Sequence, residues 1–114
     1  MYMAHNERDA VIRTKILNEI ADIESFTAGL TEVSFAASKI AQKAVVMSMI
    51  NIGELSKALS DDYLSATSQI PWKAIRGLRN IAAHHYESIR TSNIWVTVCN
   101  DIPFLKITLE NTPA

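Results

Sequence analysis

An isoleucine recurs every three or four residues along an early segment of the chain, and this spacing limits the fold more than any other feature of the sequence. Residues with this spacing lie on one face of an α-helix, whereas a half-buried β-strand places apolar residues at every second position. Polar side chains fill most of the positions between them. We therefore predict an amphipathic helix over residues 9–26 that buries one face. Its apolar positions are Ile12, Ile16, Ile20 and Ile23.

Cap residues mark the next two helices. Gly29 ends the first helix, and Thr31 caps a short helix that runs through Phe35. A long helix is expected over residues 38–60, where Gly53 suggests close backbone packing because glycine disfavours a helix. The expected apolar positions of this helix are Ile40, Ala44, Met47, Ile50 and Leu55, and the unbroken run Ala44-Val45-Val46-Met47 predicts a central helix buried on more than one side.

Two more helices are expected in the second half of the chain. Residues 61–70 are predicted to form a connection, and Pro71 suits the first turn of the helix that follows it. A last helix begins near Asn93. Pro103 crowds the carbonyl four residues before it and donates no backbone hydrogen bond, so this helix should kink or break over residues 99–101. The apolar positions of these helices are Ile75, Leu78 and Ala82, then Ile94, Val98, Ile102 and Leu105.

The composition favours one helical domain. A chain of 114 residues has the ordinary length for one hydrophobic core, and three glycines and three prolines are few for an all-β fold. We predict an all-α, up-and-down bundle of four to five helices over residues 1–114. No segment resembles a signal peptide or a membrane span, so a cytoplasmic protein without membrane contact is expected. The single cysteine, Cys99, is expected to pack as a small apolar side chain.

The main concentration of basic residues lies within residues 63–86. This stretch contains no Asp or Glu, although the whole chain has a net charge of −1. Three-residue steps place Lys73, Arg76 and Arg79 along one broad side of the predicted helix, which suits contacts with phosphates. A plain solvated helix surface has the same pattern. Lys73, Arg76 and His85 are candidate substrate contacts on this basis.

Other kinds of site are not indicated. The histidines do not occur in a His-Glu-x-x-His or Cys/His spacing, so no zinc ion is expected. The chain also has no glycine-rich phosphate loop and no Gly-x-Ser-x-Gly turn. Metal-dependent hydrolysis and NTP hydrolysis are therefore disfavoured, and we expect neither a metal ion nor a cofactor.

A more specific pattern closes the basic stretch. Arg79-Asn80 is followed after three residues by His84, and Tyr86 stands two residues further on. This arrangement resembles the motif of HEPN-domain toxins of the HepT group, in which Arg and a polar residue precede His-x-Tyr by three residues. The resemblance extends over nearly the whole chain. It includes the stretches Ile52-Gly53-Glu54-Leu55, Pro71-Trp72 and Pro103-Phe104-Leu105.

The resemblance implies a homodimeric, HEPN-like helical bundle in which the motifs of two subunits meet in a cleft. It also implies a metal-independent ribonuclease encoded beside a minimal nucleotidyltransferase (MNT) antitoxin, which silences the toxin by transferring AMP to the motif tyrosine. By position, Arg79 and His84 would be catalytic, Asn80 would support them, and Tyr86 would be the AMPylated residue. RNA would be the substrate, and the partners would be a second copy and the antitoxin.

The residue types suit this chemistry. Cleavage of RNA without a metal needs a group that exchanges protons near neutral pH, so His84 fits the role of general acid or base. Negative charge grows on the phosphate oxygens in the transition state, where the forked guanidinium of Arg79 can donate two hydrogen bonds. Attack by the 2′-hydroxyl would leave a cyclic phosphate end.

Helical geometry limits how one chain could build the site. At about 100° per residue, Tyr86 returns close to the direction of Arg79, whereas His84 lies about 140° away. Either the helix loosens near His84 or a second subunit completes the site. Two alternatives stay open. Arg79, His84 and Tyr86 stabilise the fold and take no part in a reaction. Or the protein is a non-catalytic HEPN module that docks a nucleotidyltransferase and presents nucleotide or substrate to it.

Overall fold

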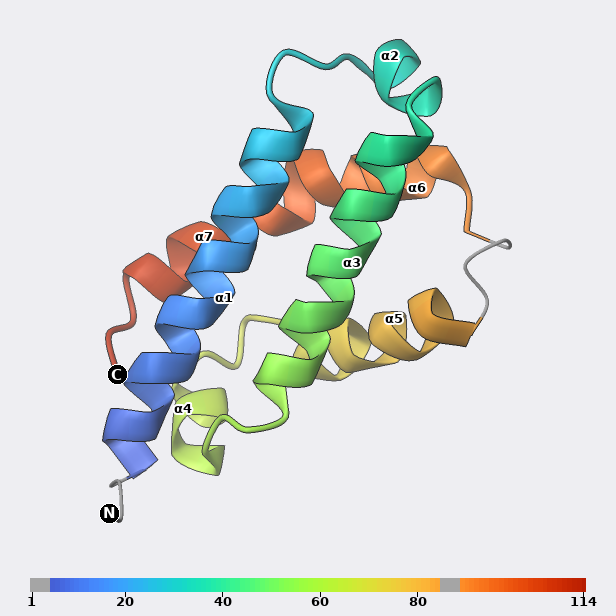
Figure 1. Ribbon diagram of the computed structural model, residues 1–114. Coiled ribbons are helices and arrows are strands. Elements are labelled where there is room, and N and C mark those ends of the chain that lie inside the picture. Colours follow the sequence, from blue (N-terminus) through green and yellow to red (C-terminus); the bar gives the residue numbers. More distant parts are fainter. Residues whose placement is uncertain (1–4, 85–88) are drawn as a thin grey trace.

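The computed structural model describes the backbone of residues 5–84 and 89–114; the side chains at positions 5, 78, 79 and 81–84 lie outside the description (Figure 1). Every regular element in these ranges is helical, so the predicted all-α class is confirmed. The described elements are α1 His5–Thr27, α2 Glu32–Ala36, α3 Lys39–Ser56, α4 Asp61–Ala66, α5 Trp72–His84, α6 Thr91–Val96, the π-helix η2 Thr97–Asp101 and α7 Ile102–Glu110. This division is finer than the four to five helices predicted.

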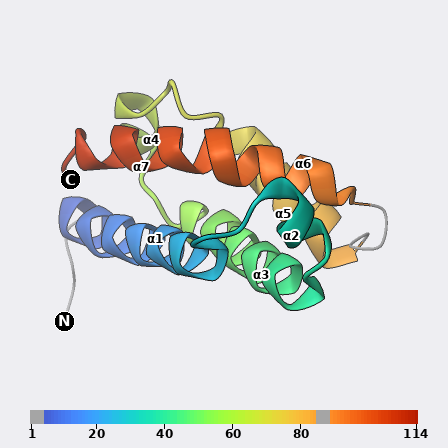
Figure 2. The ribbon, with the colours of Figure 1, turned by 90° about the horizontal axis from the view of Figure 1, so that it is seen from above.

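The long helices lie in layers (Figure 2). α1 and α3 run antiparallel side by side in one layer, and α6, η2 and α7 follow one another over it. α5 packs extensively against α3 and crosses its C-terminal half (Figure 1). None of the described helices is long and apolar enough to cross a membrane.

The isoleucine face of α1 is the centre of the hydrophobic core. Ile16, Ile20 and Ile23 are fully buried, and Ile12 is nearly so, which confirms the amphipathic helix predicted from their spacing. Burial of each such side chain contributes about 1.5–3 kcal/mol. Gly29 ends the turn after α1 with a φ of +76°, in the left-handed region that glycine adopts without strain.

The prediction for α3 is right only in part: Ile50 and Leu55 pack against the core, and Val45 and Val46 of the run 44–47 are buried. Ile40 is 84% exposed and Met47 is 57% exposed, whereas Val45, Met49 and Ile52 are buried. The segment is apolar on nearly every side, so spacing alone does not indicate which face turns inward. Packing against both α1 and α5 decides it.

The segment predicted as a connection contains a short helix, α4. Ser60 caps it by accepting a hydrogen bond from the backbone N–H of Tyr63 at 3.2 Å. The negative charges of Asp61 and Asp62 in its first turn stabilise the positive N-terminal end of the helix. Ser60 also donates its N–H, at 2.8 Å, and its hydroxyl to the buried carboxylate of Asp9. This buried contact ties α4 to α1.

The C-terminal end of the chain is held by two further polar contacts. The hydroxyl of Tyr63 donates to the carbonyl of Thr112 at 2.6 Å, and Nε of Arg13 donates to the carbonyl of Leu109 at 2.8 Å. Burial raises the pKa of Tyr63, although the nearby positive charge of Arg13 acts in the opposite direction. These contacts join α1, α4 and the end of α7.

The kink predicted before Pro103 takes the form of the π-helix η2. A π-turn closes its hydrogen bonds over five residues instead of four and so adds a residue to the turn. The widened turn admits Pro103 into the first turn of α7, and the helical path continues. Cys99 is exposed, so the prediction that it packs as an apolar side chain is wrong; the core side of this segment is occupied by Val98 and Ile102.

Candidate functional site on helix α5

Trp72 anchors the N-terminal end of α5, the helix that carries most of the motif. Its side chain is 6% exposed, and its Nε1 donates to the hydroxyl of Thr67 at 2.9 Å. That hydroxyl in turn donates to the carbonyl of Tyr63 at 2.8 Å. The start of α5 is therefore fixed to α4 by a buried chain of hydrogen bonds.

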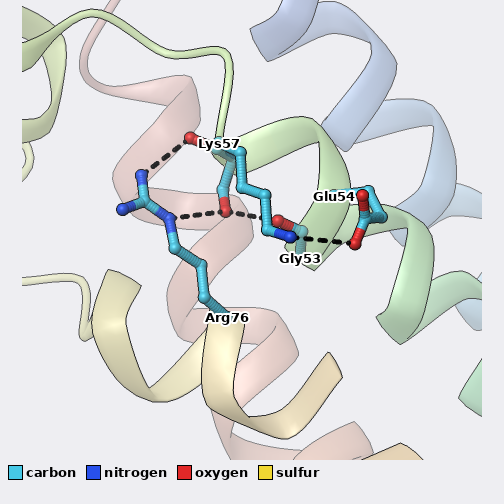
Figure 3. Close-up of polar contacts among 5 residues, drawn as sticks. Gly53, Glu54, Lys57 and Arg76 are labelled. Carbon is cyan, nitrogen blue, oxygen red and sulfur yellow. Dashed lines mark hydrogen bonds and ion pairs between the residues drawn. The ribbon is translucent and has the colours of Figure 1, made fainter. Parts of the chain in front are cut away.

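Arg76 fixes α5 to the end of α3 (Figure 3). Its Nη2 donates to the carbonyl of Ser56 at 2.9 Å, and its Nε donates to the hydroxyl of Ser56 at 3.3 Å. The Ser56 hydroxyl donates to the carbonyl of Gly53 at 2.7 Å. The last carbonyls of a helix lack partners within it and carry partial negative charge, so a guanidinium is well placed there.

The predicted basic surface is divided as a result. Lys73 is exposed and forms no ion pair with any residue that the structure describes. Arg76 is half-buried, and its guanidinium points to Ser56 rather than outward with Lys73. The charge pattern did not reveal this structural contact, because Ser56 lies twenty residues earlier in the chain.

The structure describes the motif only in part. Asn80 is exposed on α5. The backbones of Arg79 and His84 belong to the same helix, but their side chains lie outside the described residues, as do His85 and Tyr86 altogether. The convergence of these side chains in one site therefore stays a prediction.

A polar groove, which the sequence did not indicate, runs between α1 and α3. It has a volume of about 490 Å³. Asn51 of α3 donates to Glu19 of α1 at 3.3 Å, and Glu54 lies 3.2 Å from the ammonium of Lys57 (Figure 3). The side chains that line the groove are Lys15, Asn18, Glu19, Asn51, Glu54, Leu55 and Ala58. The carboxylates of Glu19 and Glu54 offset the charges of Lys15 and Lys57, so the groove has no excess of positive charge to attract phosphate.

Metal-ligating geometry is also absent from the described residues, in which no three His, Cys, Asp or Glu side chains come together. What the described part of α5 offers is a helix anchored at one end, with Lys73 and Asn80 exposed on it. Such an arrangement presents polar and basic groups to a ligand from a fixed support.

Comparison with known proteins identifies the family. The chain belongs to the HepT-like family, described as ribonuclease HepT-like, whose profile matches residues 16–112. This membership confirms the resemblance to HepT-group HEPN proteins.

Several relatives are similar over most of their length. A Methanocaldococcus jannaschii protein named provisionally as RNase MJ0127 is 40% identical over 88 residues, which cover 77% of this chain and 73% of that protein. A second protein of that organism, named in the same way as RNase MJ1380, is 33% identical over 83% of this chain and 87% of its own length. A Thermococcus cleftensis protein, provisionally named ribonuclease HepT, is 34% identical over 79% of this chain and 86% of its own. No solved structure matches the chain significantly.

Proposed function

We propose that this protein is a ribonuclease that cleaves RNA without a metal ion. The observation that carries the proposal is the position of the motif: Arg79, Asn80 and His84 lie along α5, and the other end of this helix is fixed by Trp72 and Arg76. Membership of the HepT-like family and relatives named as RNases support the same activity.

The proposed reaction is an internal transfer of the phosphate. His84 takes the proton of the 2′-hydroxyl, whose oxygen attacks the adjacent phosphorus, and the bond from phosphorus to the 5′-oxygen breaks. A proton then passes to the leaving 5′-oxygen, so the products are a 2′,3′-cyclic phosphate and a 5′-hydroxyl. Arg79 stabilises the charge on the phosphate oxygens, and Asn80 orients the reacting groups.

Analysis of the RNA ends tests this proposal. The purified chain, freed of AMP, should cleave a labelled RNA in EDTA and leave cyclic phosphate ends. A single 2′-deoxy substitution should block cleavage at that linkage alone. Cleavage that requires Mg²⁺, or that continues at the 2′-deoxy position, would contradict the mechanism. Absence of cleavage, with tight binding to a nucleotidyltransferase, would favour the non-catalytic HEPN module instead.

The proposal includes assembly and regulation. A two-fold dimer would bring the motifs of two subunits together, since one regular helix does not point Arg79 and His84 the same way. An MNT-type antitoxin would then silence this toxin by transferring AMP to Tyr86, because the added phosphate can pair with Arg79 and occupy the place of the substrate.

Mass spectrometry after co-expression with the nucleotidyltransferase tests the regulatory part. The AMP group should be found on Tyr86. Tyr63 is a useful internal control because it is 5% exposed and its hydroxyl is bonded to Thr112. AMP on Tyr2 alone, or normal silencing of a Tyr86→Phe variant, would contradict this assignment.

A further inference from the structure

Gly77 lies in the middle of α5, where neither the backbone conformation nor close packing within the described fold requires a glycine. Its φ is not in the left-handed region, and a Cβ added at this position would meet no described atom within 4 Å. Glycine destabilises a helix relative to alanine, because the unfolded chain has more conformations to lose. An alanine would therefore fit the isolated chain better than the glycine that is present.

The glycine lies on the outward face of α5 between two exposed polar residues. Lys73 precedes Gly77 by four residues and Asn80 follows it by three, and this spacing places them on one side of the helix. Trp72 and Arg76, which anchor the helix, point to the core and to α3 instead. The same spacing continues to position 84, so the line runs toward the motif.

The charge of this face indicates what could cover it. The ammonium of Lys73 forms no ion pair within the described chain, and residues 63–86 contain no acidic side chain. A two-fold contact centred on Lys73 would bring two lysines together, so a dimer that joins the motifs is expected to meet nearer the other end of α5 and to leave Lys73 uncovered. Phosphate groups supply the missing negative charge.

We propose that single-stranded RNA lies along the line Lys73–Gly77–Asn80, with one phosphate beside Lys73 and the sugar–phosphate backbone closest to the helix at Gly77. A side chain at position 77 would hold the backbone away from the helix, and glycine removes this obstacle. The inference rests on the proposed ribonuclease function and adds the path by which the substrate reaches the motif.

Binding of an RNA that cannot be cleaved tests the path separately from the chemistry. The probe is a fluorescent single-stranded oligonucleotide with 2′-O-methyl sugars, and its affinity is measured by anisotropy over a range of KCl concentrations. The variants of the full chain are Lys73→Ala, Gly77→Ala and Gly77→Leu. Lys43→Ala is the matched control, because Lys43 is an exposed helical lysine of α3 that forms no ion pair with any described residue.

We expect Lys73→Ala to weaken binding and to reduce the slope of log affinity against log salt by about 0.7, the value for one phosphate contact on a single strand. Gly77→Leu should weaken binding about tenfold or more without lowering the melting temperature, as expected for loss of a close backbone approach. Gly77→Ala should raise the melting temperature and weaken binding less. Lys43→Ala should bind as the wild type does.

Three results would overturn the path. The first is wild-type affinity in Gly77→Leu and Lys73→Ala, and the second is a wild-type chain that does not bind the probe. The third is weaker binding in Gly77→Leu that accompanies dissociation of a dimer in sedimentation, which would assign Gly77 to a contact with a second copy. Cleavage of the unmodified RNA, measured alongside, separates the two proposals: binding along this line without cleavage would support the path and refute the nuclease.

Discussion

α1 and α5 are held in the fold in different ways. Ile16, Ile20 and Ile23 of α1 are fully buried, so that helix is fixed by apolar packing along most of its length. α5 packs against α3 and is fixed near its beginning by hydrogen bonds from Trp72 and Arg76, and it exposes Lys73 and Asn80. If the proposed function is right, stability and activity are carried mainly by different helices. Substitutions in α1 should then change stability, and outward substitutions in α5 should change activity.

The largest effect on stability is expected in α1. Ile20→Ala should lower the free energy of unfolding by about 2–5 kcal/mol, because it removes fully buried methyl groups and leaves a cavity. Urea denaturation measures this loss. Ile40→Ala is the matched control, since Ile40 is 84% exposed and its loss should change stability by no more than about 0.5 kcal/mol. Equal losses in the two variants would show that the described core is wrong.

A smaller loss is expected at the anchor of α5. Arg76→Met should cost about 1–3 kcal/mol, because the buried Ser56 would lose the donors to its carbonyl and hydroxyl. Lys73→Ala removes an exposed side chain that directly follows Trp72, and it should stay within about 0.5 kcal/mol of the wild type. Thermal unfolding of both variants measures the two losses of stability. If Lys73→Ala were the more damaging change, the division between an anchored and an accessible side of α5 would fail.

The sequence predicted correctly those features for which the local pattern allows only one way of packing. The isoleucines of α1 form a single apolar stripe, so their burial follows from spacing alone. α3 is apolar on several sides, and its buried face depends on packing with α1 and α5. The sequence Ser60-Asp61-Asp62 did carry a cap signal for α4, which was missed.

The candidate site could be predicted only in part from the sequence. The motif follows from the local sequence, and the backbone of its part from Arg79 to His84 lies on α5. The hydrogen bonds from Arg76 to Ser56 could not be predicted, because they depend on the position of the end of α3 in the fold. The same holds for Gly77, whose outward position follows only from the burial of Trp72 and the direction of Arg76.

The smallest expected effect on stability concerns Tyr63 and its dependence on pH. Tyr63→Phe should cost about 1 kcal/mol at neutral pH, because the hydrogen bond to Thr112 is lost. The pKa of Tyr63 is raised in the folded state, so folding favours the protonated hydroxyl. This contribution is complete below the ordinary pKa of about 10 and is lost as the pH rises through the raised value. Urea denaturation between neutral pH and pH values above about 10 should show a steeper decline for the wild type than for Tyr63→Phe. Parallel declines would contradict the burial of this hydroxyl.

The most direct test of the central claim is RNA cleavage in EDTA by His84→Ala, measured together with its free energy of unfolding. We predict that this variant loses cleavage while its stability stays within about 0.5 kcal/mol of the wild type, because the claim separates the function of α5 from the stability of the core. His5→Ala is the matched control and should cleave as the wild type does. Undiminished cleavage by a folded His84→Ala variant would contradict the assignment of the chemistry to α5.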